Sequence, residues 1–161
     1  MKPTSRSIVL ADDNDDDAFL TKRAMESAGV THSIHHCRDG QAVIDYLEGR
    51  LVEGEKLGAS DLPDVLLLDL KMPRLGGLET LKWIRSHETF KSLVVLALTS
   101  SSEERDVKAA YDLWINAYLV KPSSLTEMID LARAIRLFWL DQNHLIRPRA
   151  NAAAPIGIAR P

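Results

Sequence analysis

The sequence predicts an α/β protein in which helices cover both faces of one five-stranded parallel sheet, a doubly wound arrangement. Short apolar runs alternate along the chain with longer segments of helical period, which gives five strand–helix units in series. The apolar runs are continuous rather than alternating with polar residues, and this is typical of strands buried on both faces. Right-handed crossovers between parallel strands then place helices on both sides of the sheet.

Five apolar runs predict the strands. The third run is the strongest: residues 65–68 read Val-Leu-Leu-Leu, with Pro63 and Asp64 before them and Asp69 after them. The second run is the weakest. The predicted strands are residues 7–11, 33–37, 65–68, 93–98 and 117–120.

A segment with a helical period follows each run. In residues 41–51 the apolar side chains share one face, as in a helix packed on a core. Gly29 ends the first helix, and Pro73 with Gly76 and Gly77 marks the loop before the third. The predicted helices are residues 18–28, 41–51, 78–86, 103–113 and 125–145.

An acidic stretch separates the first strand from the first helix. We interpret Asp15, Asp16 and Asp17 as solvated acids of the first helical turn, where negative charge interacts favourably with the helix dipole. Asn14 before them is a typical N-cap residue. We therefore do not assign these three acids to a functional site.

The length of 161 residues favours a single domain. We assign residues 1–146 to this domain and expect residues 147–161, rich in Ala, Pro and Arg, to form a disordered tail. Such a tail is too short to be an output domain. Residues 52–62 form a polar insertion between the second helix and the third strand.

Composition restricts the functional classes. A net charge of −3 provides no basic field for nucleic acid. The single cysteine, Cys37, excludes an internal disulfide and a zinc site with several thiolates, and we interpret it as a small buried hydrophobic residue. No apolar run is long enough for a signal peptide or a membrane span, so we expect a cytoplasmic protein without a membrane or nucleic-acid partner.

Polar side chains stand directly after four of the predicted strands. Asp12 and Asp13 follow the first strand and Asp69 follows the third. Thr99 follows the fourth strand and Lys121 the fifth. Since the carboxyl ends of parallel strands meet at one edge of a sheet, these groups are predicted to share one cleft. Each position alone has an ordinary explanation as a cap, turn or surface residue, but their coincidence at four strand ends favours a functional site.

This set of groups suits phosphoryl transfer. Three carboxylates repel one another unless a cation holds them, and hard oxygen ligands suit Mg²⁺. An aspartate can act as a nucleophile and form an aspartyl phosphate. The cation, the Lys121 ammonium and the Thr99 hydroxyl would each offset charge on the oxygens of the transferring group.

These residues resemble the receiver domain of two-component response regulators. The resemblance extends over residues 7–145 and implies the flavodoxin-like, CheY-like fold of five strand–helix units. The matching segments are residues 10–14, 66–73, 97–100 and 118–122.

The resemblance implies that Asp69 is the phospho-acceptor and that a sensor histidine kinase is the donor. Asp13, Asp69 and the backbone carbonyl of Lys71 would bind Mg²⁺. Asp12 would act mainly through a bound water. Lys71 stands where Asn is common in the family, but only its carbonyl is needed. We expect a signalling protein rather than an enzyme, whose chemistry is limited to its own phosphorylation and dephosphorylation.

The resemblance also implies a switch. Thr99 would move to bond the phosphoryl group, Lys121 would pair with it, and Tyr118 would turn inward. In the family the bond corresponding to Lys121–Pro122 is usually cis. One departure is Trp114, which with the next residue stands where Gly-Ala is common and places a large apolar group near the surface that changes on activation.

A narrower resemblance links the chain to receiver-only regulators that partner bacterial phytochromes, through residues 52–62, 99–104 and 135–140. It implies a bacteriophytochrome kinase as donor and a homodimer. Residues 138–140 read Phe-Trp-Leu, and three consecutive helical positions cannot all face one core. We therefore expect a dimer contact through the last helix and the C-terminal extension, unless the insertion or the tail covers this surface.

Three other functions are disfavoured by the sequence. Phosphatases of the haloacid dehalogenase type need a second Asp two residues after the nucleophile, where this chain has Lys71. A non-phosphorylated adaptor would not need every site residue, and a transcription factor is disfavoured by the negative charge and the short tail. His35 and His36 point to opposite faces of a strand and are poor joint ligands, so we interpret them, with His32, as structural.

Overall fold

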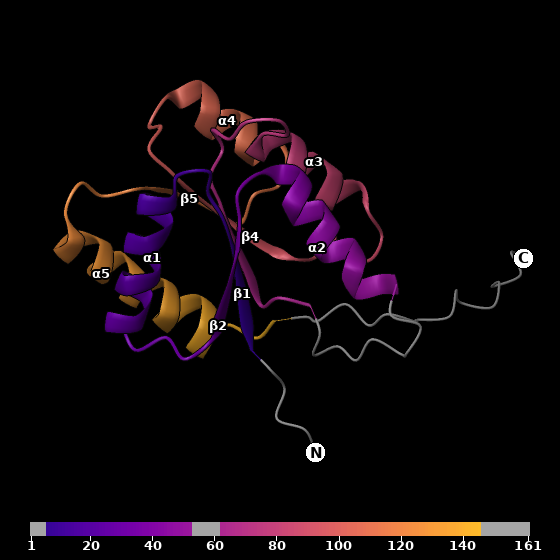
Figure 1. Ribbon diagram of the computed structural model, residues 1–161. Helices are drawn as coiled ribbons and strands as arrows, with labels where there is room; N and C mark the ends of the chain where they lie inside the picture. Colours follow the sequence, from indigo (N-terminus) through magenta and orange to yellow (C-terminus); the bar gives the residue numbers. More distant parts are fainter. Residues whose placement is uncertain (1–5, 53–61, 146–161) are drawn as a thin grey trace, which may run out of the picture.

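Five parallel strands form one sheet in the order β2-β1-β3-β4-β5 (Figure 1). The computed structural model describes residues 6–52 and 62–145. Every neighbouring pair of strands is parallel, which confirms the predicted fold class. The strands are β1 Ser7–Ala11, β2 Ser33–Cys37, β3 Val65–Leu68, β4 Val94–Thr99 and β5 Ala117–Val120. The predicted tail at 147–161 and nearly all of the insertion at 52–62 lie outside the described residues.

Helices cover both faces of the sheet. In Figure 1, α1 and α5 lie on one face, while α2, α3 and α4 lie on the other. The helices are α1 Asp15–Ser27, α2 Gly40–Val52, α3 Gly77–Ser86, α4 Glu104–Asp112 and α5 Leu125–Ile135. The predicted N-cap is confirmed, because the Asn14 side chain accepts hydrogen bonds from the N–H groups of Asp16 and Asp17. Among the described residues, no helix is both long and apolar enough to cross a membrane.

The last helix is shorter and less regular than predicted. It leaves the α-helical pattern at Ile135, and the chain continues as a π-helix, η1, over Arg136–Gln142. The N–H of Asn143 closes this segment by bonding to the carbonyl of Phe138, five residues back. The expectation for residues 138–140 is confirmed: Leu140 is buried, whereas the Phe138 side chain is exposed.

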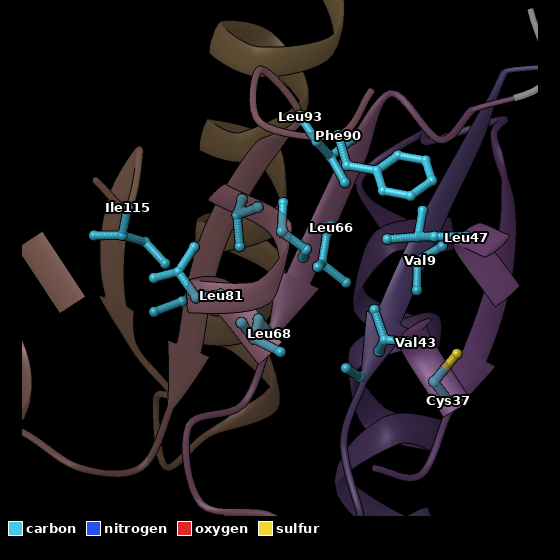
Figure 2. Close-up of a cluster of buried hydrophobic side chains, with 14 of the residues drawn as sticks. Val9, Cys37, Val43, Leu47, Leu66, Leu68, Leu81, Phe90, Leu93 and Ile115 are labelled. Carbon is cyan, nitrogen blue, oxygen red and sulfur yellow. The ribbon is translucent and has the colours of Figure 1, made fainter. Parts of the chain in front are cut away.

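Strand β3 lies at the centre of the sheet and supplies apolar side chains to both faces. Leu66 and Leu68 belong to the core cluster beneath α2 and α3 (Figure 2). Val65 and Leu67 belong to the cluster beneath α1 and α5. Burying one such side chain stabilises a fold by about 1.5–3 kcal/mol, so the strand that precedes Asp69 is held firmly from both sides.

Cys37, at the end of β2, lies in the first of these clusters (Figure 2). Burial raises the pKa of its thiol to about 11. The thiol therefore stays protonated at neutral pH, as expected of a small hydrophobic residue, and the prediction is confirmed.

Trp114 ends the turn after α4 in a left-handed backbone conformation, with φ of 61°. The N–H of Trp114 bonds to the carbonyl of Tyr111 and the N–H of Ile115 to that of Ala110, the pattern that usually places glycine at this position. The side chain is 78% exposed, while Ile115 is buried behind it. A tryptophan at this position thus costs backbone strain without gaining burial.

We expect Trp114→Gly to exceed Trp114→Ala in free energy of unfolding by about 1 kcal/mol, because only glycine lacks the Cβ that crowds a left-handed backbone. Urea denaturation followed by circular dichroism measures the difference. Comparing two small residues at one site removes the contribution of the indole ring. Equal denaturation midpoints for the two variants would contradict the strain.

Candidate functional site

The sheet brings the predicted site residues to one edge. Asp12 and Asp69 directly follow β1 and β3, Thr99 ends β4 and Lys121 directly follows β5. Parallel pairing continues past the strands: the N–H of Asp69 bonds to the carbonyl of Ala11, and the N–H of Lys121 to that of Thr99. The backbone pairing therefore holds these residues at one edge of the sheet, as predicted.

Asp12, Asp13 and Asp69 form an acidic cluster, with one carboxylate oxygen of each within 4.8 Å of the others. Asp12 and Asp69 are buried, and Asp13 is exposed. Burial raises the pKa of Asp12, although the Lys121 ammonium and the N–H of Asn14 oppose this effect. Clustered carboxylates of this kind suit a divalent cation with oxygen ligands. In the described part of the chain, no other group of three or more Asp, Glu, His or Cys side chains is placed to hold a metal ion.

The Lys121 ammonium contacts three carboxylates. Its Nζ lies 2.8 Å from Asp12 Oδ2, 3.0 Å from Asp17 Oδ2 and 3.1 Å from Asp69 Oδ2. Burial alone would lower the pKa of Lys121, but hydrogen bonds to Asp12 and Asp17 and the charge of Asp69 outweigh it and raise the pKa. Lys121 is therefore a permanent positive charge beside Asp69.

The interpretation of Asp17 as a solvated acid outside the site was wrong, because its carboxylate contacts Lys121. Its carboxylate does lie in the first turn of α1, but it turns toward Lys121 instead of being fully solvated. Asp15 pairs with Arg38 on the surface, and Asp16 is exposed. Three adjacent acids look alike in the sequence, and only the rotation of α1 about its axis decides which one reaches the site.

The backbone of Lys71 contacts Asp69, whereas its side chain contacts Asp106 on α4. Its N–H donates to Asp69 Oδ1 at 3.1 Å. Its ammonium lies 3.1 Å from Asp106 Oδ2 on α4, and the Ser101 hydroxyl donates to the same oxygen at 2.6 Å. The Ser101 hydrogen bond, followed by Lys71, lowers the pKa of Asp106. This network joins the loop after β3 to α4, and no pattern in the sequence indicates it.

Thr99 and Tyr118 lie beside this network. Thr99 is fully buried, and its Oγ1 lies 3.5 Å from the N–H of Ser101. The Tyr118 hydroxyl donates to the Ser101 carbonyl at 2.9 Å. Burial raises the pKa of this phenol. The two residues predicted to form the switch thus both contact the loop that follows β4.

The peptide bond that follows Lys121 differs from the expectation. The described residues contain no cis peptide bond, so Lys121–Pro122 is trans and the expectation of a cis bond was wrong. Even for proline the trans form is favoured by about 0.5–1 kcal/mol.

A groove of about 310 Å³ lies beside Lys121. It is lined by residues of α1, of the turn after Lys121 and of the start of α5, including Leu20, Leu125 and Met128.

The histidines have structural contacts. The His32 side chain is buried, with its Nε2 3.4 Å from Asp64 Oδ2, and burial lowers the pKa of His32. His35 stacks on Tyr46, and His36 Nε2 lies 2.8 Å from the backbone carbonyl of Asp12. None of the three belongs to the acidic cluster. His36 supports the backbone of the site, a role that the sequence did not reveal.

Comparison with known proteins places the chain among signalling proteins. The family model described as response regulator receiver domain matches residues 8–133. The "Probable methanogenesis regulatory protein FilR2" of Methanothrix harundinacea is 39% identical over 136 residues, 84% of each chain. The response regulator Rcp1 of Synechocystis sp. is 33% identical over 134 residues, 83% of this chain and 88% of that protein.

Two solved structures are similar over nearly their whole length. The crystal structure of the Mn²⁺-bound form of Rcp1 has a TM-score of 0.75 and 32% identity, covering 88% of this chain and 99% of that one. The phosphorylated cyanobacterial phytochrome response regulator RcpA has a TM-score of 0.76 and 34% identity, covering 87% of this chain and 97% of that one.

We expect Lys121→Met to bind Mn²⁺ about tenfold more tightly than the unsubstituted protein, a change of about 1.4 kcal/mol. The ammonium and a divalent cation compete for the carboxylates of Asp12 and Asp69. Isothermal titration calorimetry measures the affinity. Lys91→Met is the matched control, because Lys91 is exposed and pairs with Glu88 away from the site. Unchanged affinity in Lys121→Met would contradict the competition.

Proposed function

The chain belongs to the response regulator receiver domain family, and on this premise we propose that it accepts a phosphoryl group from a histidine kinase on Asp69, with Mg²⁺ in the acidic cluster. One observation carries the proposal. The Asp69 carboxylate lies at the end of the central buried strand, between two further carboxylates and a permanent ammonium.

The reaction uses the carboxylate as a nucleophile. An Asp69 oxygen attacks phosphorus, the bond from phosphorus to the imidazole nitrogen of the kinase breaks, and that nitrogen keeps the electron pair. Lys121, 3.1 Å from Asp69 Oδ2, offsets charge on the transferring oxygens. The buried hydroxyl of Thr99 is a further donor that could bond to a phosphoryl oxygen. Motion of Thr99 would then move the loop after β4, because the N–H of Ser101 contacts its hydroxyl.

We assign the metal ligands to Asp12, Asp13, Asp69 and the backbone carbonyl of Lys71. The three carboxylates form the acidic cluster already described. Mg²⁺ neutralises their charge and that of the phosphoryl oxygens when it is bound. The Mn²⁺-bound form of Rcp1 supports a divalent cation in a protein of this fold.

The partner that supplies the phosphoryl group would dock beside Lys121. Phe19 and Leu20 of α1 and Leu125 of α5 are exposed apolar side chains, and the last two line the groove next to Lys121. An apolar helix face of a kinase suits this surface. Because RcpA is a phytochrome response regulator, we propose a bacteriophytochrome kinase as this partner.

We propose that the chain forms a homodimer through α5 and η1. Leu137 and Phe138 are exposed next to each other on η1, and the Phe138 ring packs edge-on against Trp139. Apolar side chains in this arrangement favour association with a second copy. The expected contribution of the C-terminal extension concerns residues outside the described ranges.

The alternative is an adaptor that keeps the fold and is not phosphorylated. The complete set of acidic, hydroxyl and ammonium groups around Asp69 favours the phospho-acceptor. A phosphatase of the haloacid dehalogenase type is disfavoured, because Lys71 occupies the place of the general acid and pairs with Asp106.

We expect incubation with acetyl phosphate and Mg²⁺ to add the mass of one phosphoryl group to the protein and none to Asp69→Asn, which lacks the nucleophilic oxygen. Intact mass spectrometry measures the addition. Asp16→Asn is the control, because Asp16 is an exposed acid of the same edge without a contact to Lys121. An unlabelled wild type would favour the adaptor.

We expect the double substitution Leu137→Ser, Phe138→Ser to weaken the dimer at least tenfold, since it removes exposed apolar area without touching buried Leu140. Light scattering over a range of concentrations measures the mass. Tyr111→Ser is the control, because Tyr111 on α4 is 51% exposed, close to the 59% of Phe138, on the other face of the sheet. A dimer of unchanged strength would remove this interface.

A further inference from the structure

Lys121 has one partner that stands apart from the other two. Asp12 and Asp69 belong to the acidic cluster, whereas Asp17 does not. The Asp17 side chain is 42% exposed and approaches the ammonium from the solvent side, while the Lys121 side chain is only 10% exposed. The ammonium therefore has two buried acceptors, Asp12 and Asp69, and one partly exposed acceptor, Asp17.

The number of acceptors matches the number of donors. An ammonium has three N–H groups, and the three carboxylates lie between 2.8 and 3.1 Å from Nζ. Asp17 sits on a firm element, because the Asn14 side chain accepts from its N–H at 3.0 Å and α1 packs along α5. The backbone of Asp17 is thus held in place, within reach of the Lys121 ammonium.

We propose that Asp17 is a positioning residue for phosphotransfer, which keeps the Lys121 ammonium directed at Asp69. This inference rests on the proposed function. When a cation occupies the acidic cluster, Asp12 and Asp69 share their charge with it and attract Lys121 less. Asp17 lies outside the cluster, so its attraction persists. It then holds the long, flexible side chain of Lys121 at the point where a phosphoryl group arrives.

The kinetic test compares Asp17→Ala with Asp16→Ala, which removes the same charge from the same helical turn without a contact to Lys121. Phosphorylation by acetyl phosphate is followed by intact mass at saturating Mg²⁺. We expect the limiting rate of Asp17→Ala to fall roughly three- to tenfold. The acetyl phosphate concentration for half-maximal rate should not rise, because the site loses negative charge. Asp16→Ala should stay within about twofold of wild type.

Two further variants separate positioning from folding. Asp17→Glu keeps the charge and should recover most of the rate, while Asp17→Asn keeps the size and should not. Circular dichroism and urea denaturation should give wild-type stability for all four variants, since Asp17 is half-exposed. Equal rates for wild type and Asp17→Ala, or an equal loss in Asp16→Ala, would overturn the proposal.

A second readout does not need phosphotransfer. In protein labelled with ¹⁵N at lysine Nζ and saturated with Mg²⁺, we expect slow solvent exchange of the Lys121 ammonium protons in wild type and Asp16→Ala, and exchange at least tenfold faster in Asp17→Ala. Similar exchange in all three proteins would overturn the positioning role. A wild type that is not phosphorylated but shows this difference would instead contradict only the proposed function.

Discussion

The Lys121 ammonium lies between the carboxylates of Asp12, Asp17 and Asp69 and offsets their mutual repulsion. Like charges at this spacing would otherwise repel one another or take up protons. The raised pKa of Asp12 indicates that burial still disfavours its charged form, even with an ammonium 2.8 Å away. Counting Asp13, four carboxylates lie near one ammonium here, and this excess of negative charge favours a divalent cation.

The fold maintains this arrangement by fixing the backbone first. Two apolar clusters hold the strands that precede the charged residues, and hydrogen bonds between strands extend to Asp69 and Lys121 themselves. Contacts of the side chains then link the site to its surroundings, through Lys71 to α4 and through Tyr118 to the loop after β4. Both contacts lead to the loop after β4 and the start of α4, where Ser101 also bonds to Asp106.

The sequence predicted the sheet, the strand ends and the residues that follow them, because each is marked locally by a polar residue after an apolar run. It did not predict contacts that depend on how one element is rotated against another. Asp17 faces the site because of the orientation of α1, and the side chain of Lys71 crosses to α4. The change to a π-helix at Arg136 and the left-handed turn at Trp114 likewise depend on tertiary packing.

The sheet holds strands β3 and β5 to different degrees. Strand β3 has a neighbour on each side and four buried residues, whereas β5 is an edge strand with no fully buried residue. Asp69 follows the first of these strands, and Tyr118 and Lys121 belong to or follow the second. Edge strands open locally at lower free energy than central ones. The sheet therefore holds the strand before Asp69 more firmly than the strand that carries Tyr118 and precedes Lys121, so this edge can open locally without displacing Asp69.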